Sequence, residues 1–136
     1  MSDEVPEGYQ PFVLDSPFLK HIGPVYQRHS ETRHSLGLRV APYHCNALGI
    51  VHGGLLMTLA DVALGNISDR PGGTAPCVTV SMSCEFSAGA REGDWIEVSV
   101  DVMKHSSSLH FANCYLCVND VPIARASGVF KVVKPR

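Results

Sequence analysis

Asp61 is the residue of this chain whose position most clearly suggests chemistry. It lies in the middle of a predicted apolar helix, and the residues one turn away offer no Lys or Arg to pair with it. Burying an unpaired carboxylate costs several kcal/mol, so a protein that keeps one usually uses it. Such a group can serve as a general base or as a nucleophile. The structural alternative is a carboxylate that is paired by a distant residue or lies at a dimer contact.

The turn His52-Gly53-Gly54 precedes or opens the same helix. Backbone N–H groups at a helix N-terminus lack intrahelical acceptors, and the helix dipole favours negative charge there. Glycine also lets a ligand carbonyl approach the backbone closely. The two glycines are therefore candidates to hold a developing oxyanion, and they also suit a tight turn. Asn46, in the preceding loop, is equally suited to cap that loop with its side chain.

Residues from about Gly54 to about Ser68 are predicted to form the central helix of the domain. Apolar residues cover nearly every side of it, which is typical of a buried helix, and it is too short to span a membrane. The sequence Arg70-Pro71-Gly72-Gly73 ends the helix. Other elements must therefore wrap around it. The apolar positions are Leu55, Leu56, Met57, Leu59, Ala60, Val62, Ala63, Leu64 and Ile67.

The second half of the chain changes its apolar period from 3.6 to 2, which predicts strands at 78–86, 96–102, 109–118 and 121–133. In the first of these, Val78 and Val80 fall on the apolar face, and Gly128 in the last is expected to mark a bulge. Upstream, a helical turn is predicted at 17–22 and short strands at 24–29 and 36–41. This order predicts an α+β fold in which a curved antiparallel sheet wraps one long helix.

The length of 136 residues predicts one domain, residues 1–136, with a loose tail over residues 1–10. The net charge of -2 and the lack of a basic run argue against nucleic acid as a partner. An acidic, polar N-terminus predicts a cytoplasmic protein without a membrane partner. The five cysteines, odd in number, are expected to be reduced thiols. His34, His44 and His52 with Cys45 match no zinc motif, so neither a metal nor another cofactor is expected.

The pattern Asn46-x-x-Gly49-x-x-His52-Gly53-Gly54, followed by Asp61, resembles the hotdog-fold acyl-CoA thioesterases of the phenylacetate-pathway (PaaI-type) branch. Val78-Thr79-Val80 is similar to the family strand that carries a Ser or Thr near the active site. The segment from Phe86 to Asp94 is similar to a family turn. The resemblance extends over roughly residues 23–133 and implies the hotdog fold.

The resemblance implies hydrolysis of an acyl-CoA thioester to a free acid and coenzyme A. In that reading, the Gly53 N–H holds the oxyanion, and Asp61 acts as general base or nucleophile. Asn46 would orient water or the thioester carbonyl, His52 would position the turn, and Thr79 would orient the lytic water beside Asp61.

In relatives, the His-Gly-Gly turn and the Asp of one site come from two subunits. Asp61 lies about 10 Å along the helix axis from Gly54, which is compatible with such an arrangement. The resemblance therefore implies a homo-oligomer, a dimer with shared active sites that assembles into a homotetramer. The acyl pocket is expected between the two central helices, lined by Leu55, Leu56 and Met57.

A further set of positions resembles those that contact the pantetheine and nucleotide of coenzyme A. Two differences from the family affect how coenzyme A would be bound. Gly89 stands where Pro is usual, and Ser107 stands where a basic residue is common. The cations that remain to meet phosphates are Arg91 and Lys104, although ordinary solvated surface charge is the better explanation of each one taken singly. The substrate-binding set is Gly54, Ala88, Gly89, Arg91, Lys104 and Ser106.

Two other functions fit the same fold. A non-catalytic acyl-CoA binding or sensing module is the main alternative, although binding alone requires no buried carboxylate. A hotdog hydratase or dehydratase fits less well, because the His-Gly-Gly turn and the mid-helix Asp61 differ from the arrangement of those enzymes. The reaction product distinguishes the three, since only a thioesterase releases a free thiol.

Overall fold

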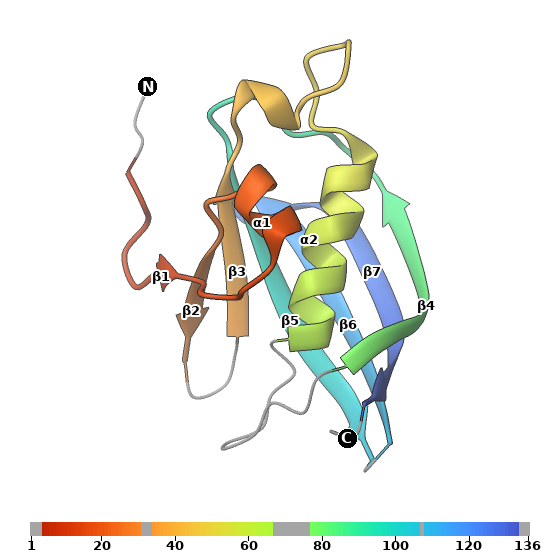
Figure 1. The fold of residues 1–136 in the computed structure, drawn as a ribbon. Helices are drawn as coiled ribbons and strands as arrows, with labels where there is room; N and C mark the ends of the chain where they lie inside the picture. The colour runs from red at the N-terminus through yellow and green to blue at the C-terminus, as the bar shows by residue number, and fades with distance from the viewer. Residues whose placement is uncertain (1–3, 31–33, 67–76, 107, 134–136) are drawn as a thin grey trace.

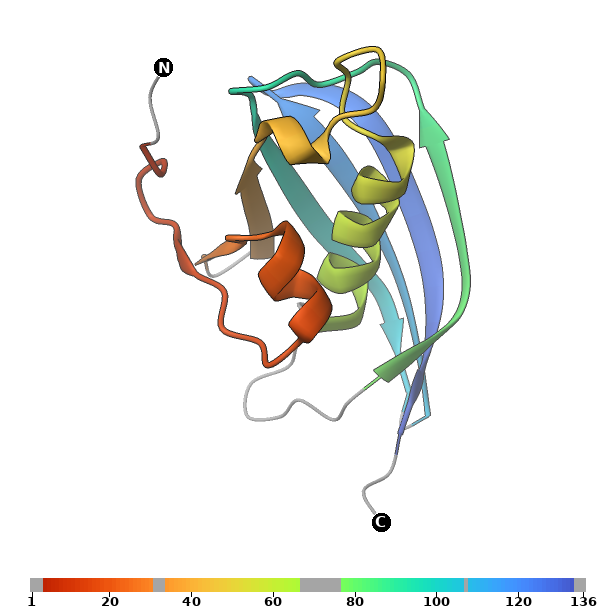
Figure 2. The same cartoon turned by 45° about the horizontal axis from the view of Figure 1, so that its top comes forward.

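A seven-stranded antiparallel sheet curves around one helix in the computed structural model, which describes residues 4–30, 34–66, 77–106 and 108–133 (Figures 1 and 2). The order of strands across the sheet is β1-β2-β3-β5-β6-β7-β4. This is the predicted α+β hotdog architecture. The strands are β1 (Gln10–Pro11), β2 (Tyr26–His29), β3 (His34–Arg39), β4 (Cys77–Phe86), β5 (Trp95–His105), β6 (Leu109–Val118) and β7 (Val121–Val132), and the helices are α1 (Pro17–Ile22), the 3-10 turn η1 (Pro42–His44) and α2 (Gly53–Asn66).

Helix α2 is the predicted central helix, and it begins one residue earlier than expected. Its predicted end at Ser68 lies outside the described residues. Its inner face packs into the concave side of the sheet through Leu55, Leu56, Leu59, Ala60, Ala63 and Leu64, all of which are buried. The prediction of a helix buried all round is wrong for the single chain, because Met57 is 38% exposed and Asp61 and Val62 are only half-buried.

The meander β5-β6-β7 forms the predicted antiparallel centre of the sheet. Asn119 and Asp120 join β6 to β7 with φ values of 50° and 64°, as a two-residue hairpin turn of this kind requires. The predicted bulge at Gly128 is absent, because Gly128 keeps register with Met82 and Ala112. A Cβ at Gly128 would lie 2.7 Å from the Phe130 ring, so the glycine makes room for that buried ring.

Strand β4 departs most from its prediction. Its register with β7 shifts between Thr79 and Ser81. A bulge of this kind reverses the alternation of side chains along a strand. Thr79 therefore shares the inner side with Met82, which packs against the core, whereas Val78 and Val80 are 51% and 59% exposed. The period-2 pattern predicts both valines on the buried face of the strand, and this prediction is wrong.

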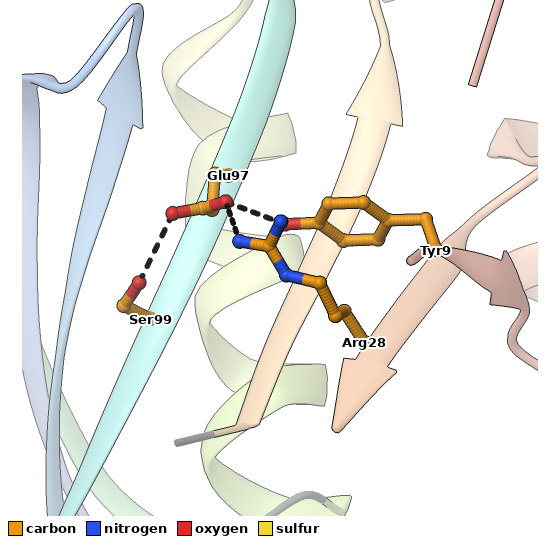
Figure 3. Close-up of polar contacts among 4 residues, drawn as sticks. All are labelled: Tyr9, Arg28, Glu97 and Ser99. Atoms are coloured by element: carbon orange, nitrogen blue, oxygen red, sulfur yellow. Dashed lines mark hydrogen bonds and ion pairs between the residues drawn. The ribbon is translucent and has the colours of Figure 1, made fainter. Parts of the chain in front are cut away.

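The N-terminal segment differs from the loose tail predicted for residues 1–10. Tyr9 is buried and its hydroxyl donates a hydrogen bond of 2.6 Å to Glu97 on β5 (Figure 3). The Arg28 guanidinium on β2 donates to the same carboxylate at 2.8 Å. The Tyr9 ring packs edge-on against Trp95, with ring centroids 5.1 Å apart. Burial, and then the bond to Glu97, raise the pKa of the Tyr9 hydroxyl, so this contact holds at neutral pH.

The helices described in the structure are too short or too polar to cross a lipid bilayer. None of the five cysteines, all of which lie in the described part of the chain, forms a disulfide bond.

Candidate active site

Helix α2 lies between α1 and the start of β4 (Figure 1). Asp61 is half-buried on this helix and lines a pocket together with residues of α1. The Thr79 hydroxyl donates a 2.5 Å hydrogen bond to Asp61 Oδ1. Thr79 reaches this position because of the bulge that follows it in β4. The second carboxylate oxygen, Oδ2, has no hydrogen-bond partner within the described part of the chain. The two residues are therefore brought together as predicted, with one oxygen of the carboxylate held and the other open.

The start of α2 is organised by His52. Its backbone N–H donates to His44 O at 2.9 Å, and its ring Nδ1 accepts the Gly54 N–H at 2.9 Å. The neutral ring must then carry its proton on Nε2, because Nδ1 is the acceptor. His44 is itself fixed, since it is buried, accepts the Ala41 N–H on Nδ1 and faces Ile22 O with Nε2 at 2.6 Å. His52 thus holds the turn, as its predicted positioning role requires.

The Gly53 N–H is the donor that this arrangement leaves open. Gly53 is the first residue of α2, and its N–H finds no acceptor among the residues that the structure describes. A Cβ added at Gly53 would meet only the Phe86 ring, at 3.7 Å, which is ordinary van der Waals contact. By contrast, a Cβ at Gly54 would lie 3.0 Å from His52 Nδ1. Gly54 is therefore explained by packing within the turn, whereas no packing contact explains Gly53.

Asn46 caps the loop before the helix. Its side-chain Oδ1 accepts the backbone N–H groups of Leu48 at 2.9 Å and Ile50 at 3.2 Å. This is the loop-capping alternative raised by the sequence. Because these two donors fix which end of the amide is oxygen, Nδ2 is left as a donor on an exposed residue, with no acceptor in the described ranges. The two roles of Asn46 are therefore compatible.

The turn that holds Ala88, Gly89 and Arg91 lies against the same loop. Val51 N–H donates to Ala90 O at 2.8 Å, and Ile50 forms an isolated β-bridge with Arg91. A Cβ at Gly89 would lie 2.7 Å from the Ile50 side chain, so glycine permits this close contact. The Arg91 side chain is exposed and makes no ion pair with another described residue. These three predicted residues thus gather at the Gly53 end of α2.

Lys104 and Ser106 lie at the other end of the sheet. Strand β5 begins at Trp95, near Arg91, and reaches Lys104 nine residues later, about 30 Å away at the rise of a strand. The Lys104 side chain is outside the described part of the structure, although its backbone pairs with Phe111. The Ser106 hydroxyl accepts the Leu109 N–H at 2.9 Å, so it already serves its own turn. A single chain therefore does not bring Arg91 and Lys104 to one place.

The same separation applies to the catalytic candidates. Gly53 and Asp61 are eight residues apart on one helix, about 12 Å along its axis. One thioester carbonyl cannot contact both groups of the same chain. The group of Asn46, His52 and Gly53 lies at the start of α2, and the pair of Asp61 and Thr79 lies about two turns further along the helix, so these are two distinct parts.

A pocket of about 390 Å³ adjoins Asp61, between α1 and α2, and we call it the α1–α2 pocket. Leu55 and Leu56, which are expected to line the acyl pocket, are buried in the core of this chain, whereas Met57 lines the α1–α2 pocket. An acyl pocket between two central helices stays a prediction. Sequence reasoning missed the contribution of α1, whose apolar residues gave no sign of their position. The lining residues are Leu14, Ser16, Phe18, Leu19, Met57, Thr58, Asp61 and Val62.

The thiols of the core offer no competing nucleophile at neutral pH. Burial raises the pKa of the Cys114 thiol to about 12, and it also raises the pKa of Cys84. A thiol attacks as the thiolate, so a raised pKa disfavours these two groups as nucleophiles. No three His, Cys, Asp or Glu side chains among the described residues are grouped closely enough to hold a metal ion.

Comparison with known proteins identifies thioesterases and an esterase among the proteins similar to this chain. The family model described as "Thioesterase superfamily" matches residues 48–120. A protein of Pseudomonas aeruginosa named "Putative esterase PA0474" is 43% identical over 130 residues, which is 93% of this chain and 96% of that protein. Human "Acyl-coenzyme A thioesterase 13" is 32% identical over 78 residues, which is 56% of this chain and 54% of that protein.

Solved structures share the fold. Zebrafish thioesterase superfamily member 2 superposes with a TM-score of 0.76 at 26% identity, over 88% of this chain and 89% of that chain. The Escherichia coli PaaI protein of the phenylacetic acid degradation operon has a TM-score of 0.76 at 16% identity, over 88% of this chain and 86% of that chain.

Proposed function

The chain belongs to the thioesterase superfamily, and from this premise we propose that it hydrolyses an acyl-CoA thioester to a free acid and coenzyme A. The observation that carries the proposal is the state of Asp61, a half-buried carboxylate that lines the α1–α2 pocket, with Oδ1 held by Thr79 and Oδ2 without a hydrogen-bond partner among the described residues. Coenzyme A as the thiol follows from the name of the acyl-coenzyme A thioesterase relative.

Asp61 is the group that activates the attack. As general base, its free Oδ2 takes a proton from water while the water oxygen attacks the thioester carbonyl carbon. As nucleophile, the same oxygen attacks directly and forms a mixed anhydride that water then hydrolyses. Either way, the carbon–sulfur bond breaks. In the first route the sulfur of coenzyme A leaves with the proton that Asp61 took from water, and in the second it leaves as the thiolate and takes a proton from solvent. The Thr79 hydroxyl keeps Asp61 oriented, because it donates to Oδ1.

The Gly53 N–H stabilises the oxyanion that forms on the carbonyl oxygen. Among the described residues this N–H has no acceptor, and it lies at the positive end of α2, where negative charge is favoured. Asn46 Nδ2 is a second donor at this end. A preset donor of this kind contributes about 2.7–4 kcal/mol to transition-state stabilisation. His52 fixes the turn through Gly54 rather than taking part in proton transfer.

A complete site requires two subunits, because Gly53 and Asp61 of one helix are too far apart. Strand β4 supports a dimer, since it lies at the edge of the sheet, pairs only with β7 among the described strands and exposes Val78 and Val80. In a two-fold dimer, the same edge of both subunits meets, and each residue contact occurs twice. The Gly53 half of one subunit then faces the Asp61 half of the other.

The same arrangement brings the coenzyme A residues together. Arg91 accompanies Gly53 in one subunit, and Lys104 and Ser106 lie at the opposite end of the sheet in the other. Arg91 supplies a cation for the phosphates, with Ala88 and Gly89 beside it. The exposed Phe111 and Tyr115, on the face of β6 that points away from the core, support the pairing of two dimers into a tetramer.

The test is release of free thiol from a panel of short, medium, long and aryl acyl-CoAs, with Asp61→Asn beside the wild type. We expect hydrolysis by the wild type and a fall in kcat of about 10²–10⁴-fold in Asp61→Asn, the range for loss of a general base. Asp120→Asn is the matched control, because it removes one negative charge in a turn whose backbone Asn tolerates.

Two results would contradict the proposal. Full activity in Asp61→Asn would remove this residue from the mechanism. Acyl-CoA binding without thiol release from any member of the panel would replace hydrolysis by a binding or sensing role.

A further inference from the structure

Several large apolar side chains are exposed in the α1–α2 pocket, beside the Asp61 carboxylate. Leu14, Phe18 and Met57 are 38%, 58% and 38% exposed, and all three line it together with Asp61. Exposed large apolar side chains that gather in one place mark a binding site more often than they occur by chance. The lining of this pocket therefore points to a ligand that is mainly hydrocarbon.

The placement of Phe18 follows from how α1 is anchored. Ser16 caps the helix, since its hydroxyl accepts the Leu19 N–H at 3.3 Å, and Pro17 is the first helical residue. Leu19 is buried in the core, which fixes the rotation of this short helix. The preceding residue, Phe18, must then point away from the core, and its ring lies at the wall of the pocket opposite α2.

We propose that the α1–α2 pocket receives the acyl group of the substrate, and that Phe18 and Leu14 set the length of acyl chain it accepts. This inference rests on the proposed function, because it takes Asp61 as the group that acts on the thioester carbonyl. The chain then runs from the carbonyl at Asp61 along Met57 towards Phe18. The volume of about 390 Å³ lies within the range of small-molecule sites.

The charge of the pocket defines the class of acyl group. Among the described residues that line it, Asp61 alone is charged, and the other polar groups are the hydroxyls of Ser16 and Thr58. A carboxylate at the far end of an acyl group would find no cation and would be repelled by Asp61. The substrates are therefore uncharged aliphatic or aryl acyl groups, and dicarboxylic acyl groups are excluded.

The test compares Phe18→Ala and Phe18→Trp with the wild type on straight-chain acyl-CoAs of increasing length and on succinyl-CoA. Phe18→Ala removes the wall, so we expect KM to rise about tenfold for the chains that reach it, with little change in kcat, and the optimum to shift to longer chains. Phe18→Trp should shift the optimum to shorter chains. Succinyl-CoA should be a poor substrate for all three proteins.

The control is Val13→Ala, because Val13 is 89% exposed and lies outside the pocket lining. It should leave the chain-length profile unchanged. The same profile in Phe18→Ala, Phe18→Trp and the wild type would overturn the inference while leaving the proposed function intact. A changed oligomer size in Phe18→Ala with an unchanged profile would also overturn it, since the pocket would then be a subunit contact. A wild type that hydrolyses no acyl-CoA would overturn the proposed function and this inference together.

Discussion

At the scale of single residues, the helix start shows how two adjacent glycines acquire different tasks. The Gly54 N–H is taken by His52 Nδ1, and the Gly53 N–H is left open. The difference depends on the histidine ring, which acts as a cap that selects one of the two donors. The sequence motif contains both glycines, but the motif alone cannot distinguish them.

Two substitutions at Gly53 distinguish the effect of its backbone N–H donor from the effect of the space that a side chain would need there. Gly53→Pro removes the N–H at a first helical position that tolerates proline, so we expect kcat to fall about 10²–10³-fold with the fold retained. Gly53→Ala keeps the N–H and meets only Phe86, so its stability should equal or exceed that of the wild type. Measured kcat and thermal unfolding of both variants check this. Equal kcat in Gly53→Pro and the wild type would assign the oxyanion to another donor.

Several candidate residues could be predicted from the sequence because each stood out against its surroundings. Asp61 did so as a carboxylate in an apolar helix, and Thr79 did so through its resemblance to a family strand. The proximity of these two residues is confirmed by their hydrogen bond. Phe18 could not be predicted, since an apolar residue in a short amphipathic turn carries no mark of the pocket it borders. The catalytic roles themselves remain predictions.

At the scale of elements, α2 illustrates a limit of reading periodicity. An apolar residue on every side predicts burial, yet the single chain covers only the inner face of the helix. The sequence pattern indicates that every face of the helix is apolar. It does not indicate whether residues of the same chain bury each face. In β4, a one-residue bulge reversed the faces, because strict alternation assumes an unbroken register.

Strand β3 contains a glycine whose packing can be tested directly. A Cβ at Gly37 would lie 2.1 Å from the Trp95 ring, which crosses β3 at this point. We expect Gly37→Ala to lower the free energy of unfolding by about 1–3 kcal/mol, the usual cost of overpacking. Chemical denaturation measures this cost, and Gly53→Ala is the control, since its Cβ has room. Unchanged stability in Gly37→Ala would mean that Trp95 does not occupy this position in solution.

At the scale of the whole molecule, the two halves of the candidate site are separated along one helix, with Gly53 at its start and Asp61 eight residues later. This separation is a property of the fold, because the helical rise over those eight residues sets it at about 12 Å. The number of complete sites therefore depends on the pairing of subunits. It also predicts how inactive variants behave when they are mixed.

Subunits with Asp61→Asn and subunits with Gly53→Pro should restore activity to each other. A mixed dimer holds one intact site, formed by Gly53 of the first variant and Asp61 of the second. Random exchange at equal amounts should therefore return about a quarter of wild-type activity, because half of the dimers are mixed and each has one good site of two. Thiol release before and after exchange measures this. No recovery, despite exchange confirmed by mass spectrometry, would place both groups of a site in one subunit.

The position of β4 in the sheet has a consequence for folding. Hairpins β5-β6 and β6-β7 can form from neighbouring segments as they are synthesised, whereas β4 must wait for β7. Its partners lie 38 residues downstream for Phe86 and Ala124, and 55 residues downstream for Cys77 and Val132. Contacts over such distances close slowly, since they carry a large loop entropy. On the ribosome, β4 therefore joins the sheet only after β7 has been synthesised.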